Sequence, residues 1–146
     1  MKRTLVMGIG NLLLSDNGVG VHVAHFLSKR RLPAGIDVLD VGTAFFDALP
    51  AMEKAERIVI IDAVKAGGKP GDIYRLPFEK SISDPLTTLH SFDIFGMLDL
   101  TDNPNSVQIV LIGVEPEKLD WGIDLSLSVS QVLPDLLDLV CDEIGI

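Results

Sequence analysis

Apolar residues along the chain follow two alternating patterns. Some form short continuous runs, of which residues 57–62 are the clearest, with four β-branched residues in succession. Others recur at helical spacing, as Val19, Val23 and Phe26 do. A continuous β-branched run is typical of a strand covered on both faces, whereas the wider spacing is typical of a helix with one apolar stripe. The alternation of the two predicts βαβ units and a largely parallel sheet.

This interpretation divides the chain into strands and helices of one domain, residues 1–146. The predicted strands are residues 4–8, 36–41, 57–62, 72–76 and 107–114, with 72–76 at an edge of the sheet. The predicted helices are residues 18–30, residues 45–52, a segment capped by Thr88 that runs through Leu98, and a long helix from Ser126 that Pro134 should bend or interrupt. The predicted fold class is α/β, a three-layer α/β/α sandwich around a mostly parallel sheet of about five strands.

The charge and the lengths of the apolar runs argue against two classes of partner, nucleic acids and membranes. Twelve Lys and Arg against 21 Asp and Glu give a net charge of −9, which would repel a nucleic-acid backbone, so we expect no nucleic-acid partner. No stretch approaches the ~18 consecutive apolar residues of a membrane span, so we expect no membrane insertion and a cytoplasmic protein. The apolar run near the N-terminus is interrupted by polar residues, which favours a strand over a signal peptide.

Three polar loops follow predicted strands, and ligands of open α/β sheets bind at such strand ends. The loops are residues 8–20, Gly42-Thr43 and the segment from Asp62. If the first and third strands are neighbours, Asn17 and Asp62 face each other across the crevice. The glycines of the first loop invite a dinucleotide interpretation, but Leu13 stands where the third glycine of that fingerprint belongs. Turn and packing roles for these glycines are therefore favoured over phosphate binding.

Single residues offer few other candidates for chemistry. Asp62 ends an apolar strand, so its carboxylate either caps the next turn or serves a site. His90 starts a predicted helix, whose dipole favours a neutral imidazole that can ligate a metal. His22 and His25 have no acidic residue nearby in sequence, and we interpret both as structural. The single cysteine, Cys141, flanks an apolar stripe and is expected to be buried and inert.

No serine lies in a Gly-x-Ser-x-Gly elbow, so hydrolytic chemistry here would depend on a metal or on activated water. The placement of three aromatic residues is another open question. Phe45, Phe46 and Trp121 belong either to the core or to a surface for a partner.

Taken in order, five motifs resemble those of the hydrogenase maturation protease family, the endopeptidases that trim the large-subunit precursor of nickel-iron hydrogenases. The motifs are GIGNLLLSDNGVGV at residues 8–21, DVGT at 40–43, IDAV at 61–64, GKPG at 68–71 and finally His90. Each motif is weak alone, but the ordered set covers nearly the whole chain.

The resemblance implies a three-layer fold, an aspartyl-type endopeptidase activity, and a metal site built from an acidic residue in the first loop, Asp62 and His90. It also implies that nickel already inserted in the precursor is the recognition signal, so that the metal arrives with the substrate, and that zinc or cadmium can substitute in vitro. The Gly42-Thr43 loop is expected to line the substrate cleft.

One position departs from the family pattern, because Asn17 stands where an acidic ligand is expected, and an amide binds a borderline divalent ion more weakly. In one interpretation, nickel still binds through Asn17, Asp62, His90 and cysteines of the substrate. Alternatively, Asp16 swings in beside Asp62 as a catalytic carboxylate, or the chain is impaired or an engineered variant. The competing functions are a non-catalytic checkpoint that binds the precursor or its metal centre and, less favoured, a small nucleotide-binding protein.

Overall fold

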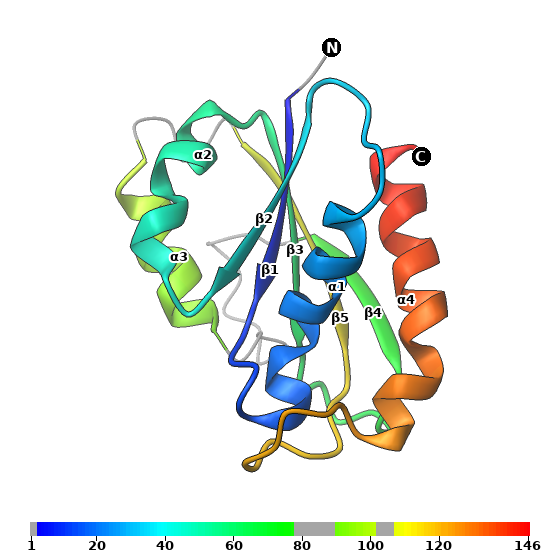
Figure 1. The fold of residues 1–146 in the computed structure, drawn as a ribbon. Helices are drawn as coiled ribbons and strands as arrows, with labels where there is room; N and C mark the ends of the chain where they lie inside the picture. The colour runs from blue at the N-terminus through cyan, green and yellow to red at the C-terminus, as the bar shows by residue number, and fades with distance from the viewer. Residues whose placement is uncertain (1–2, 78–89, 102–106) are drawn as a thin grey trace.

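A five-stranded sheet forms the middle layer of the molecule (Figure 1). The computed structural model describes residues 3–77, 90–101 and 107–146. The strands are β1 (Thr4–Ile9), β2 (Ile36–Gly42), β3 (Arg57–Ala63), β4 (Ile73–Pro77) and β5 (Gln108–Val114). Their spatial order is β2-β1-β3-β5-β4, and only the β4–β5 pairing is antiparallel. The predicted mostly parallel sheet and its edge strand are confirmed.

Helices cover both faces of this sheet, which confirms the predicted sandwich (Figure 1). The helices are α1 (Val19–Ser28), α2 (Leu49–Lys54), α3 (Ser91–Asp99) and α4 (Leu127–Ile144), with 3-10 turns η1 (Ser15–Gly18) and η2 (Phe45–Ala48). Alternate residues of the strands point to opposite faces. Val59 therefore joins a core with α1 and α4, whereas Ile58 joins a second core with α2 and α3.

Several predicted helices differ from the observed ones. The predicted helix at 45–52 is divided into η2 and α2, and α1 is shorter than predicted. Thr88 lies outside the described residues, and α3 begins at Ser91 with His90 at its N-cap.

From the sequence, Pro134 is expected to bend or interrupt the last helix, and the interruption is wrong, because α4 runs from Leu127 to Ile144 with Pro134 inside it. Proline lacks the N–H that would bond to the carbonyl of Ser130. Ser130 and Pro134 are both exposed, so water can take the place of that bond and the helix continues.

Two glycines bring α1 into backbone contact with the sheet. A Cβ at Gly8 would lie 2.2 Å from the carbonyl oxygen of Gly20, and a Cβ at Gly20 would lie 2.1 Å from that of Ile61. Side chains at these positions would push α1 away from β1 and β3. The glycines thus fix the start of α1, and with it η1, at the carboxyl ends of these strands.

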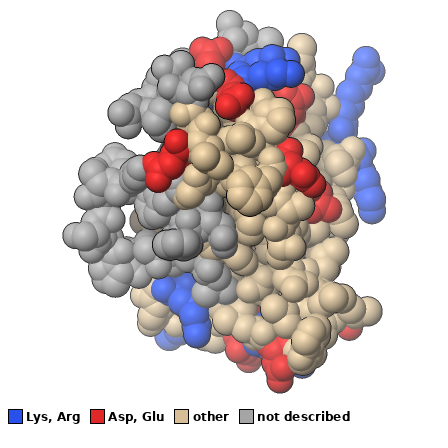
Figure 2. Space-filling view, turned by 90° about the vertical axis from the view of Figure 1, so that its left-hand side faces the viewer, with Lys and Arg blue, Asp and Glu red and all other residues tan. Residues whose placement is uncertain are grey.

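The outer face of α2 and α3 carries mostly uncharged side chains in its described part (Figure 2). Two large apolar side chains are exposed there or beside it, Phe46 at 74% and Leu100 at 53%. Among the helices that the structure describes, none combines the length and the apolar character that spanning a membrane requires.

Candidate functional site

Asp62 and His90, which are 28 residues apart in sequence, meet at the carboxyl end of β3. Oδ2 of Asp62 lies 2.8 Å from Nδ1 of His90. The other carboxylate oxygen, Oδ1, accepts a hydrogen bond from the backbone N–H of Ala63 at 2.8 Å. Asp62 is fully buried and the His90 side chain is 14% exposed. The structure therefore brings together two of the three residues that the resemblance implied.

Neighbouring elements fix both side chains. Asp62 extends from a central strand that is paired on both sides, by β1 and by β5. His90 is the N-cap residue of α3, and its ring lies 5.8 Å from the ring of Phe45, measured between centroids. Phe45 comes from η2, directly after β2. Sequence reasoning missed this aromatic contact, because nothing in the spacing of Phe45 and His90 indicates it.

Asn17, the third implied ligand, lies in η1 at the same edge of the sheet. β1 and β3 are neighbours, as the sequence analysis required, and η1 packs against β3. Oδ1 of Asn17 accepts a hydrogen bond from the backbone N–H of Asn11 at 2.8 Å. The Asn17 side chain thus connects residues 11 and 17 within the first loop. Among the described residues, no group of three His, Cys, Asp or Glu side chains is arranged to hold a metal ion.

Asp16 is fully buried, and its carboxylate bonds to the segment that follows β5 rather than to Asp62. Its Oδ2 accepts hydrogen bonds from the N–H groups of Glu117 and Lys118 and from the Ser126 hydroxyl, each within 2.9 Å. Its Oδ1 accepts one from the N–H of Ser126 at 2.8 Å. Swinging Asp16 toward Asp62, as the sequence analysis suggested, would break all four bonds. The geometry thus favours a structural role for Asp16 over a catalytic one.

The Gly42-Thr43 segment lines a small cleft beside the first loop. This cleft, of about 180 Å³, is bounded by Gly10, Asn11, Asp40, Gly42 and Thr43 among others. Gly42 has a φ of +57°, in the left-handed region, which a glycine adopts without strain and which turns the chain at the end of β2.

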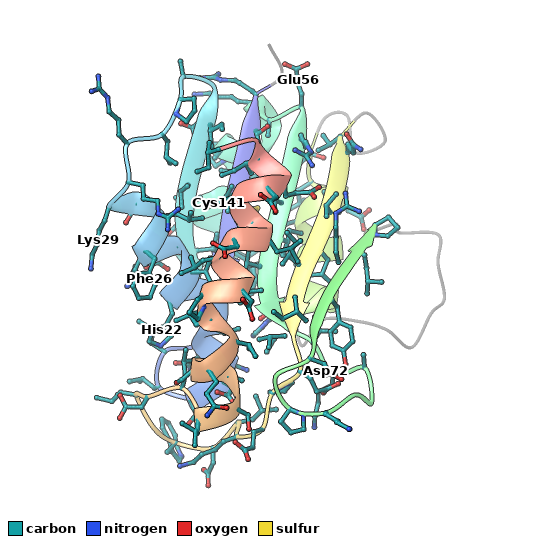
Figure 3. All side chains as sticks on the ribbon, turned by 90° about the vertical axis from the view of Figure 1, so that its right-hand side faces the viewer. His22, Phe26, Lys29, Glu56, Asp72 and Cys141 are labelled. Atoms are coloured by element: carbon teal, nitrogen blue, oxygen red, sulfur yellow. The ribbon has the colours of Figure 1, made fainter. Side chains whose placement is uncertain are left out.

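Of the remaining sequence candidates, His22 lies on α1 and Cys141 on α4 (Figure 3). His25 does have an acidic partner, Asp40, whose Oδ2 lies 2.8 Å from Nε2 of His25; the sequence analysis missed it because Asp40 is 15 residues away on β2. Nε2 of His22 is buried without a hydrogen-bond partner in the described part of the chain, and burial lowers the pKa of this histidine. Cys141 is buried, as predicted, and its sulfur accepts a hydrogen bond from Arg30.

A family model for hydrogenase maturation proteases matches residues 21–143, most of the chain, including Asp62 and His90. The chain belongs to the hydrogenase maturation protease family. It is a hydrolase of that family. The family that the sequence motifs predicted is thus confirmed.

Relatives of this protease family match over nearly the whole chain. The hydrogenase expression/formation protein HupD of Bradyrhizobium diazoefficiens is 32% identical, with 96% of this chain and 77% of that protein covered. The hydrogenase 2 maturation protease of Escherichia coli is 31% identical, with 94% and 88% covered.

Solved structures of maturation proteases share the fold. The maturating endopeptidase HybD from Escherichia coli superposes with a TM-score of 0.83 at 28% identity, covering 98% of this chain and 92% of that one. The [NiFe] hydrogenase maturation protease HybD from Thermococcus kodakarensis gives a TM-score of 0.81 at 26% identity, covering 96% and 97%.

Proposed function

We propose that this maturation protease removes the C-terminal extension of a nickel-iron hydrogenase large-subunit precursor after nickel has been inserted. The observation that carries the proposal is the contact between Asp62 and His90 at the crevice, in a chain of this family. A buried carboxylate beside an imidazole, at the sheet edge where α/β proteins bind ligands, is an arrangement suited to metal-assisted hydrolysis. We expect the reaction to take place in the cytoplasm.

The distance between the two side chains fits a shared divalent ion. Two donor atoms that each lie about 2.0–2.2 Å from one ion are separated by roughly 3.0–3.5 Å, so Asp62 Oδ2 and His90 Nδ1, now 2.8 Å apart, would share an ion after moving apart by a few tenths of an ångström. Nickel is expected to arrive as part of the precursor, so that ligands from the substrate complete its coordination, with zinc or cadmium as substitutes in vitro. An ion held there would polarise the scissile carbonyl or activate a water molecule.

The chain's own residues hold the substrate around this pair. The cleft at Gly42-Thr43 adjoins the first loop, in which Asn17 fixes the backbone at Asn11. We place the extended C-terminal segment of the precursor in this cleft. In this proposal Asp62 and His90 contact the metal, Asn17 contributes its amide at most as a weak additional ligand, and Gly42 and Thr43 contact the peptide.

The test is to mix the purified protein with a nickel-loaded large-subunit precursor and to follow the shift of the precursor on a gel. We expect cleavage by the natural chain and a loss of about 100-fold or more in rate for Asp62→Asn and His90→Gln. Asp138→Asn, on the exposed face of α4, is the matched control and should cleave normally. Unimpaired cleavage by both site variants would contradict the proposal.

A second function, a non-catalytic checkpoint that binds the precursor or its metal centre, is favoured by one observation, the amide at position 17. Complex formation without cleavage would support it. Asn17→Asp keeps the oxygen that bonds to Asn11 and adds a charge near the metal. Such a charge is worth more than about 1.4 kcal/mol, so nickel or zinc should bind at least tenfold more tightly by calorimetry. Cleavage gained only in this variant would identify the natural chain as impaired.

A further inference from the structure

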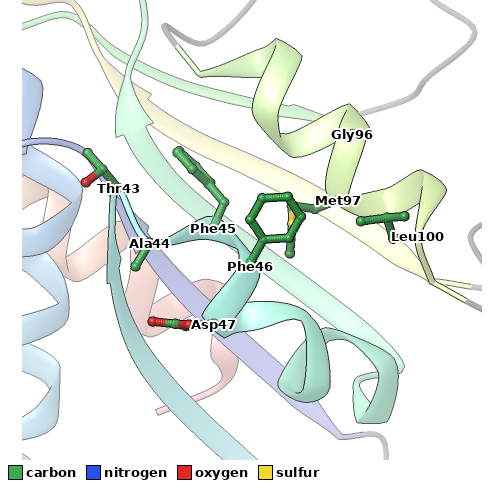
Figure 4. A pocket seen from close by; sticks show the side chains of 8 residues that line it. All are labelled: Thr43, Ala44, Phe45, Phe46, Asp47, Gly96, Met97 and Leu100. Atoms are coloured by element: carbon green, nitrogen blue, oxygen red, sulfur yellow. The ribbon is translucent and has the colours of Figure 1, made fainter.

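An apolar pocket of about 480 Å³ opens between η2 and α3 (Figure 4). Thr43, Phe45 and Phe46 line it from the side of η2, and Gly96, Met97 and the C-cap residue Leu100 line it from the side of α3. We call it the η2–α3 pocket. Its volume lies within the range of ligand pockets, roughly 300–1,000 Å³.

Two side chains of the pocket are exposed although they are large and apolar. Phe46, 74% exposed, and Leu100, 53% exposed, come from the two elements that form the pocket. Covering them would remove apolar surface from water at about 25 cal/mol per Å². Exposed apolar side chains around an apolar hollow are typical of a binding surface rather than of a bare protein exterior.

The pocket is continuous with the proposed cleavage site. Phe45, one of its walls, contacts the ring of His90, which in turn contacts Asp62. Thr43 lines both this pocket and the smaller cleft at Gly42. A peptide that passes Thr43 with its scissile bond near His90 would therefore place neighbouring side chains in the η2–α3 pocket.

We propose that the η2–α3 pocket binds apolar side chains of the precursor next to the scissile bond and so contributes to substrate specificity. This inference rests on the proposed function. Among the described residues that line the pocket, Asp47 is the only charged one, and its carboxylate would repel an acidic side chain of the substrate. Aliphatic residues or methionine are therefore the favoured occupants, and the volume admits more than one of them.

Gly96 offers a way to fill the pocket without disturbing the fold. A Cβ at this position in α3 would meet no atom of the described residues within 4 Å, apart from the backbone of its own helix and its chain neighbours. A helical glycine is also destabilising relative to other residues. A phenylalanine at position 96 would thus occupy open space at the pocket, and an alanine would add only one methyl group.

The experiment compares cleavage of the nickel-loaded precursor by the natural chain, Gly96→Phe and Gly96→Ala. We expect Gly96→Phe to raise KM about 10–100-fold with an unchanged melting temperature, and Gly96→Ala, which adds a single methyl group, to raise KM by a smaller factor. Gln131→Phe, which adds the same ring to the exposed face of α4 behind the sheet, is the matched control and should have no effect.

A second substrate tests the occupant. Replacing the apolar residues that flank the scissile bond by serine should impair cleavage by the natural chain and impair Gly96→Phe much less, because that variant has already lost the pocket. Equal KM values for Gly96→Phe and the natural chain would overturn this inference alone. Failure of the natural chain to cleave any precursor would overturn the proposed function, and this inference with it.

Discussion

Asp16 and Asn17 are neighbours in η1, yet their side chains bond to different parts of the molecule. Asp16 turns inward and connects the first loop to residues 117–126, whereas Asn17 closes its own loop at Asn11. The loop that Asp16 holds carries Trp121, which is 72% exposed. A carboxylate suits this task because it accepts several charge-assisted hydrogen bonds and donates none.

Asp16→Asn should lower the free energy of unfolding by about 2–3 kcal/mol, because an NH₂ group would then face donors of the backbone. Chemical denaturation measures this loss. Hydrogen exchange should also become faster in residues 117–126, which Asp16 ties down. Asp135→Asn on the exposed face of α4 is the control and should change stability by less than about 0.5 kcal/mol. An unchanged denaturation midpoint for Asp16→Asn would contradict the structural role.

Glycines in the two helices that frame the site have opposite surroundings. Gly20 in α1 lies against backbone oxygens of β1 and β3, so α1 can rest directly on the sheet. Gly96 in α3 faces open space at the η2–α3 pocket. One glycine is required by packing, and the other leaves a hollow that the surrounding apolar side chains do not fill.

The same substitution should therefore have opposite effects in the two helices. Gly20→Ala should destabilise the protein by about 3 kcal/mol, because its Cβ would clash with backbone that can move only if α1 shifts. Gly96→Ala should stabilise the protein by about 0.5–1 kcal/mol, because alanine lowers the conformational entropy of the unfolded chain and has a higher helix propensity than glycine. Thermal unfolding of the two variants measures both changes, and two shifts of the same sign would be inconsistent with this packing.

At the scale of the whole molecule, Glu143 joins the last helix to the sheet. Arg75 of the edge strand β4 donates from Nε and Nη2 to its carboxylate at 2.7 and 2.9 Å. Arg57 at the start of β3 bonds to the same side chain and, through Nη1, to the backbone carbonyl of Glu143 at 2.6 Å. The end of α4 is thereby held over both a central and an edge strand.

This contact predicts a dependence of stability on pH. The hydrogen bond from Arg75 lowers the pKa of Glu143 below its ordinary value of 4.5, against the opposing effect of burial. In the folded state, the Glu143 side chain therefore keeps its negative charge down to a lower pH than it does in the unfolded state. The stabilisation is present above about pH 4.5 and is lost as the pH falls through the lowered value. Glu143→Gln should melt a few degrees lower at pH 7, and the two melting temperatures should converge in acid. A difference that persists unchanged at pH 3 would refute this assignment.

Most of the fold could be predicted because it rests on local patterns. The run at residues 57–62 is apolar on both faces, so it had to be a central strand, and the glycines before residue 72 separate an edge strand from it. The errors have physical reasons as well. Helix α4 tolerates Pro134 because this residue lies on the exposed face of the helix. The predicted helix at 45–52 is divided into η2 and α2, and local periodicity does not reveal this division.

The sequence by itself determined all five strands and the approximate positions of most helices, because hydrophobic periodicity depends only on neighbours along the chain. It also determined that Asp62 and His90 were candidates. Only the tertiary structure decided that these two side chains meet, that Asp16 is occupied by a distant loop, and that Phe45 joins His90 to an apolar pocket. Contacts between residues that are far apart in the sequence depend on how the layers of the sandwich pack. The order of apolar and polar residues along the chain does not show which distant residues will come together.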